Sequence, residues 1–180
     1  MAKRPRNLAM AVMTVAVLGT PSLSAAADAI PGNEPVPHVR SSNLDLGELI
    51  DQAGERSATF RAILDTINAS DSFVFVEAGH CGHGVRACFV SVVAVGAYRY
   101  MRVVVDTRKA DWDLMGSIGH ELRHTIEVIA TPSVRDNTSK HFFYEQIGSL
   151  GTATARETRA AVDAGNTVRA EVRKFNQRAQ

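Results

Sequence analysis

Hydrophobic residues recur along this chain at two different spacings, which separate expected helices from expected strands. Apolar side chains at three- and four-residue steps predict helices, whereas short runs rich in Val, Phe and Tyr between glycine-bearing turns predict strands. The expected helices cover residues 44–51, 58–69, 111–130, 139–150 and 152–175. The expected strands cover residues 73–77, 86–95 and 98–106, with Gly96 and Ala97 forming a tight hairpin turn.

The order of these elements predicts an α+β fold. Two helices precede the strands and three follow them, so a small antiparallel sheet should pack on helices. The strand at 98–106 directly precedes the helix at 111–130. We expect it either to form a sheet edge that pairs with an extended substrate or to be a core strand. Residues 44–180 are expected to form a single domain, because a chain of this length can bury a core of its own.

The N-terminal segment has the pattern of a secretory signal peptide. A basic N-terminus, an apolar run at residues 8–18 and small residues at 24–27 predict a signal over residues 1–27. The apolar run has 11 residues, whereas a membrane-spanning helix needs about 20. Three prolines then predict an extended lead-in over residues 28–43. We expect an exported protein, periplasmic or extracellular, with no membrane attachment after cleavage.

Net charge argues against a nucleic-acid partner. The chain has 20 Lys and Arg and 19 Asp and Glu, and residues 1–26 contain three basic and no acidic residues. The remaining chain therefore has a formal charge of −2. It has no basic stripe interleaved with aromatic residues, so nucleic-acid binding is not expected.

The expected helix at 111–130 contains the sequence His-Glu-Leu-Arg-His, from His120 to His124. Residues four apart lie on one face of a helix, so both imidazoles can reach one metal ion. Zinc held by three protein ligands keeps a position open for water and lowers its pKa to about 7. Glu121 would take the proton from that water and deliver it to the leaving group, as in zinc-dependent peptide hydrolysis.

A hydrolytic zinc site needs a further protein ligand. The metzincin extension is absent, because Glu127 and Ala130 occupy its Gly and His positions. Glu127 lies on the face of the histidines, but seven residues of helix separate its Cα from that of His120 by about 10.5 Å. We therefore expect Glu127 to hydrogen-bond a ligand histidine and set its tautomer rather than to bind the metal.

The motif and its surroundings resemble small, largely uncharacterised bacterial proteins of the zincin-like superfamily. The resemblance covers most of residues 44–172 and is carried by four segments: 118–128, which holds the H-E-x-x-H core, 57–61, 144–148 and Glu157-Thr158. It implies a zincin-like fold in which the motif helix packs against the sheet.

Glu157 followed by small residues also resembles the ligand helix of gluzincins, the H-E-x-x-H enzymes whose third ligand is a downstream glutamate. That resemblance implies Glu157 as the third zinc ligand, on a helix that Ala160 and Ala161 allow to approach the motif helix. His141 and Glu145 are the other candidates, and an exposed helix glutamate is the alternative interpretation of Glu157.

Two cysteines, Cys81 and Cys88, have six residues between them. After export they would meet an oxidising compartment, which favours a disulfide closing a short loop between two strands. The alternatives are free thiols and a metal site formed with His80 and His83, although the spacing lacks the paired C-x-x-C of structural zinc sites.

These patterns lead to two functional hypotheses. The first is a secreted zinc hydrolase, most simply a metallopeptidase acting on a peptide or protein. The second is a non-enzymatic exported binding protein of zincin-like fold whose zinc is structural or absent. Tyr144 either polarises a substrate carbonyl or packs beside Phe142 and Phe143.

Overall fold

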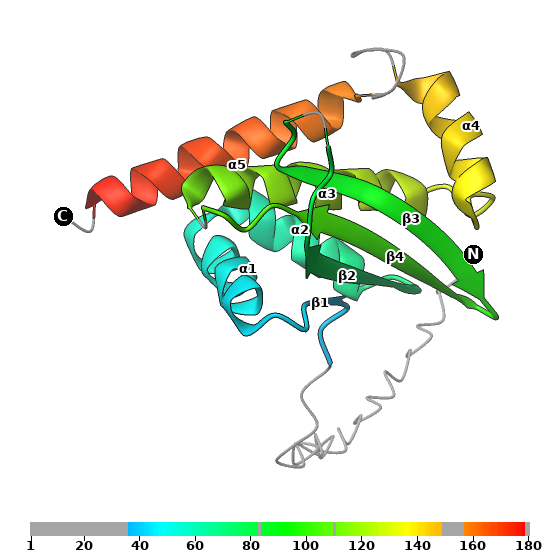
Figure 1. The fold of residues 1–180 in the computed structure, drawn as a ribbon, viewed down its shortest axis with the longest axis horizontal. Coiled ribbons are helices and arrows are strands. Elements are labelled where there is room, and N and C mark those ends of the chain that lie inside the picture. Colours follow the sequence, from blue (N-terminus) through cyan, green and yellow to red (C-terminus); the bar gives the residue numbers. More distant parts are fainter. Residues whose placement is uncertain (1–35, 83, 110, 149–156, 179–180) are drawn as a thin grey trace, which may run out of the picture. The chain divides into compact units, whose positions relative to one another are not determined.

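The computed structural model describes residues 36–82, 84–109, 111–148 and 157–178. The predicted signal peptide at 1–27 and the lead-in as far as residue 35 lie outside the described residues. The elements follow in the order β1 (Val39–Arg40), α1 (Leu44–Arg56), α2 (Ala58–Asn68), β2 (Ser72–Ala78), β3 (Ala87–Val95), β4 (Tyr98–Val105), α3 (Trp112–Ile129), α4 (Asn137–Ile147) and α5 (Arg159–Arg178) (Figure 1). The α+β class is as predicted.

The sheet is mixed, so the prediction of an antiparallel sheet was wrong. Its strand order is β1-β2-β4-β3. β1 and β4 both run parallel to β2, and only β3 and β4 are antiparallel. After β2 the chain forms β3 first and then turns back at Gly96, so β4 lies between them and runs parallel to β2. Among the described residues β4 is thus an interior strand and β3 is an edge, which removes the edge interpretation of residues 98–106.

One face of the sheet forms the core together with the helices. Val74 and Val76 of β2 and Met101, Val103 and Val105 of β4 alternate along their strands and are almost completely buried. They belong to one cluster with apolar side chains of α1, α2 and α3. This packing places the motif helix α3 against β3 and β4.

Helix α3 is held at both ends by buried or half-buried polar contacts. At its start, the Asp111 side chain caps the helix and binds Nη1 of Arg86 at 2.9 Å. At its end, the buried guanidinium of Arg99 donates to the carbonyl oxygen of Val128 at 2.8 Å and pairs with Asp71 at 2.9 Å. A cation at the C-terminus of a helix is favourable, so Arg99 anchors the motif helix to the sheet.

Three glycines, Gly116, Gly119 and Gly165, let α3 and α5 pack closely, and we call them the glycine seam. A Cβ atom on Gly165 would lie 3.0 Å from the carbonyl oxygen of Gly116 and 3.0 Å from Cβ of His120. Ala161, which was predicted to permit this approach, is fully buried. The two helices lie side by side in Figure 1. Side chains of α5 fill the space that the missing Cβ atoms leave, Arg169 over Gly116 and Val168 over Gly119.

Cys81 and Cys88 form the predicted disulfide. The alternative metal site that included both thiols was therefore wrong, because their sulfur atoms are bonded to each other. A disulfide suggests a location outside the cytoplasm. Among the described residues, none of the helices has the length and apolar character needed to cross a bilayer.

Candidate metal centre

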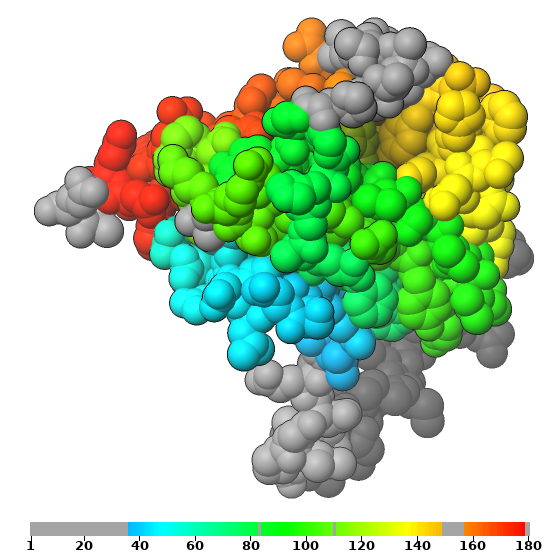
Figure 2. Space-filling model, viewed as in Figure 1, coloured from blue at the N-terminus to red at the C-terminus, as the bar shows by residue number. Residues whose placement is uncertain are grey.

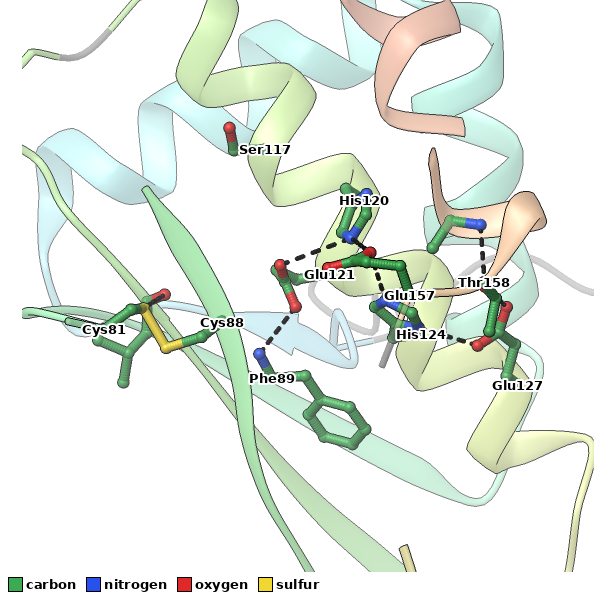
Figure 3. A network of polar contacts seen from close by, with 12 residues as sticks. Cys81, Cys88, Phe89, Ser117, His120, Glu121, His124, Glu127, Glu157 and Thr158 are labelled. Carbon is green, nitrogen blue, oxygen red and sulfur yellow. Dashed lines mark hydrogen bonds and ion pairs between the residues drawn. A yellow bond between two sulfur atoms is a disulfide. The ribbon is translucent and has the colours of Figure 1, made fainter. Parts of the chain in front are cut away.

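His120 and His124 project from one face of α3 toward the carboxylate of Glu157 (Figure 3). Oε2 of Glu157 lies 2.8 Å from Nε2 of His120 and 3.6 Å from Nε2 of His124. One ligand atom from each residue falls within 4.8 Å of the others. The structure thus brings together three side chains that could hold a metal ion.

Glu157 lies two residues before the start of α5. The sequence placed it inside a helix, but the helix starts at Arg159. Thr158 acts as the cap, because its Oγ1 accepts a hydrogen bond from the backbone N–H of Ala161 at 3.2 Å. Glu157 precedes the cap, which frees its side chain from the helix surface and lets it reach the histidines.

The contacts of Glu157 fit a bound cation. Its Oε2 is buried and, within the described chain, receives no hydrogen bond of acceptable geometry, although an imidazole nitrogen lies 2.8 Å away. The pKa of Glu157 is held well below its ordinary value by His120 and His124. We attribute this lowering to the proximity of the two rings rather than to an aligned hydrogen bond. Buried polar atoms without partners are rare, and two imidazoles with one carboxylate form a donor set that suits zinc.

Glu127 supports the far side of His124. Its Oε2 lies 2.9 Å from Nδ1 of His124, and its Oε1 accepts a hydrogen bond from Thr158 at 2.6 Å. Glu127 therefore links a candidate ligand on α3 to the residue next to Glu157. A Nδ1–H donated to Glu127 leaves the lone pair of Nε2 directed at the cluster.

The charge state of His124 reflects these neighbours. Burial by itself would lower the pKa of His124, but the carboxylates of Glu127 and Glu157 outweigh it and raise this pKa to about 9. A proton held this firmly must leave when a metal binds through Nε2.

Glu121 lies between the cluster and the edge strand β3. Its Oε2 accepts a hydrogen bond from the backbone N–H of Phe89 at 2.8 Å, and its Oε1 is 3.9 Å from Nε2 of His120 (Figure 3). Burial raises the pKa of Glu121 above its ordinary value. Oε2 of Glu121 is thus fixed by β3, and Oε1 faces the cluster formed by His120, His124 and Glu157.

A pocket of about 690 Å³ opens over this group and is lined by residues of β3, α3, α4 and α5. His141 lines it but is not part of the three-residue cluster, and its side chain is 67% exposed and 3.6 Å from Glu145. Tyr144 donates its hydroxyl hydrogen to the carbonyl oxygen of His124 at 2.8 Å, and burial raises its pKa. This contact favours the packing interpretation of Tyr144.

Three contributors to the site were not anticipated from the sequence. The backbone of Phe89 carries no side-chain signature, and Lys140, which lines the pocket, belongs to no motif. Thr158 is different, because a threonine before an amphipathic helix is a preferred cap residue. That preference is the one signal that would have located the start of α5 and the position of Glu157.

The chain matches no protein-family model, no curated protein and no solved structure. The zincin-like resemblance therefore rests on the motifs of the sequence alone.

Proposed function

We propose that this protein is an exported zinc-dependent hydrolase, a metallopeptidase of the gluzincin type with a zincin-like fold. His120, His124 and Glu157 are its zinc ligands, and Glu121 is its general base. The observation that carries the proposal is the convergence of the three ligand atoms within 4.8 Å, beside a buried glutamate and an open pocket.

The donor set supports zinc and hydrolysis together. Two imidazole nitrogens and one carboxylate oxygen correspond to the ligand sets of hydrolytic zinc sites. When bound, zinc would supply a Lewis acid and an open coordination position. Export is supported by the N-terminal pattern and by the Cys81–Cys88 disulfide.

Glu121 is suited to moving a proton. The hydrogen bond from Phe89 fixes its Oε2, so Oε1 can take a proton without reorientation of the side chain. Burial raises its pKa toward the pH at which a general base works best. In hydrolysis Glu121 would take a proton from the attacking water and pass it to the departing amine.

Zinc content and cleavage of a peptide library test the proposal. The dialysed protein should retain stoichiometric zinc, and Glu121→Gln should retain zinc but lose cleavage. Glu157→Gln should weaken zinc binding by more than the roughly 10- to 100-fold typical of a residue that only hydrogen-bonds a ligand. Glu55→Gln, at an exposed position of α1, is the matched control and should change neither property. Full activity of Glu121→Gln would remove Glu121 from the mechanism.

The second candidate is an exported binding protein whose zinc is structural or absent. It is favoured by the hydrogen bonds that already occupy β3, where Val92 donates to Asn137 and Ala94 donates to Arg135. A peptide cannot pair with these positions while the bonds persist. Stoichiometric zinc in the wild type together with no cleavage of any library peptide would favour this candidate.

A further inference from the structure

Lys140 places a cation in the pocket beside the proposed general base. Its Nζ donates to the carbonyl oxygens of Phe89 at 3.0 Å and Val90 at 2.7 Å, and it lies 4.4 Å from the centre of the Phe89 ring. The side chain is half-buried, and within the described chain no carboxylate forms an ion pair with it. An ammonium has three N–H donors, so one donor remains for a ligand.

Lys140 and Glu121 are held by the same residue of β3. Phe89 donates its N–H to Glu121 and offers its carbonyl oxygen to Lys140. The N–H and C=O of one residue in a strand point to the same side. The ammonium and the carboxylate therefore lie next to each other along the outer edge of β3, and both line the pocket.

Beyond Lys140 the edge of β3 is closed. We call residues 135–140 the α4 strap, because they run from the preceding loop into α4 along β3. Oδ1 of Asn137 accepts from the N–H of Val92 at 3.0 Å, and the carbonyl of Arg135 accepts from the N–H of Ala94 at 2.9 Å. In Figure 2 the surface of α4, in yellow, lies directly against that of β3, in green. An extended peptide reaching Phe89 cannot continue along the strand.

We propose that Lys140 binds the free C-terminal carboxylate of the substrate, so that the enzyme is a C-terminal exopeptidase. This inference rests on the hydrolase function proposed above and adds the class of substrate. The α4 strap closes the edge of β3 next to the base. The ammonium at that point forms no ion pair with a carboxylate of the described residues, so it complements a substrate carboxylate rather than a continuing chain.

The reaction is the hydrolysis of a peptide bond near the C-terminus. Water adds to the carbonyl carbon and the C–N bond breaks. The new carboxylate stays with the longer fragment. The proton that Glu121 takes from water goes to the amine of the released fragment, whose own carboxylate stays on Lys140 during the step.

Two pools of N-acetylated tripeptides, identical except for a free or an amidated C-terminus, test this assignment. Wild-type protein with zinc should cleave the free-acid pool faster, as measured by mass spectrometry. Lys140→Met should lower the ratio of kcat/KM for free acids over amides by about 10- to 100-fold, the usual value of a charge-assisted hydrogen bond. Lys140→Arg should restore part of the preference. Lys174→Met, at an exposed position of α5, should behave as wild type.

The possible results separate this inference from the hydrolase proposal. Equal cleavage of both pools keeps the hydrolase and overturns the role of Lys140. If neither pool is cleaved, the proposal of peptide hydrolysis is wrong. Saturation-transfer NMR with metal-free and zinc-loaded Glu121→Gln protein then tests whether Lys140 binds a C-terminal carboxylate, which we call the anion site. Transfer of saturation to the free-acid peptides alone supports the anion site if this transfer is lost in the double variant Glu121→Gln, Lys140→Met. Equal saturation of both pools overturns it.

Discussion

Replacing Gly165 with alanine should weaken both the fold and the metal centre. The added Cβ would lie 3.0 Å from Gly116 O and 3.0 Å from Cβ of His120, whereas non-bonded atoms of this size rest about 3.5 to 4.0 Å apart. Neither neighbour can rotate away, so α3 and α5 must separate by roughly half an ångström. Overpacking costs about 1 to 3 kcal/mol and alanine gains up to about 1 kcal/mol over glycine in a helix. The net loss should be roughly 1 kcal/mol.

Urea unfolding and zinc titration measure the two effects. The matched control is Gly47→Ala in α1, where a Cβ atom would have nothing within 4 Å. It should gain up to about 1 kcal/mol and leave zinc affinity unchanged. Gly165→Ala should lose stability and bind zinc more weakly, because the shift moves Glu157 relative to His120. A gain in stability for Gly165→Ala equal to that of the control would refute the close contact in the glycine seam.

Three further predictions concern the surroundings of the metal centre. Glu127→Gln should keep the fold but weaken zinc binding by roughly 10- to 100-fold, and unchanged affinity in a chelator competition would contradict this. Serine at both Cys81 and Cys88 should lower the free energy of unfolding by about 2 to 3 kcal/mol, as closing a loop of this length predicts; equal urea midpoints and slopes for the two proteins would argue against it. Burial lowers the pKa of Lys140 to about 8, so its cation is present below about pH 8 and lost above. The ratio of kcat/KM for free-acid over amidated peptides should therefore fall as pH rises through 8, and a flat ratio would count against the anion site.

Local patterns predicted the helices and strands better than their arrangement. The second helix was expected at 58–69 and is Ala58–Asn68. The first was expected to end at residue 51 but continues to Arg56, because Ala53 and Gly54 extend its buried face with side chains too small to give a hydrophobic signal. The alternation of residues along a strand shows which face is buried but not which strand is its neighbour. The position of β4 between β2 and β3 therefore could not be predicted from the sequence.

Most of the metal cluster could be predicted from the sequence, because its two histidines are four residues apart on one helix. Glu157 came from resemblance to known ligand helices, and its exact position depends on where Thr158 starts α5. The environment of Lys140 was beyond local reasoning. It depends on the packing of α4 on β3, which joins residues 50 and 51 apart in the sequence.

The α4 strap also bears on how copies of this protein behave at high concentration. An uncovered sheet edge recruits strands from other molecules and is a common origin of aggregation. Within the described residues, one outer strand, β1, has only two residues, and the other has its backbone donors engaged by Asn137 and Arg135. Any ligand that lifted α4 from β3 would uncover a strand ready to join that of a neighbour, so the hydrogen bonds that close this edge to a ligand also close it to strands of other molecules.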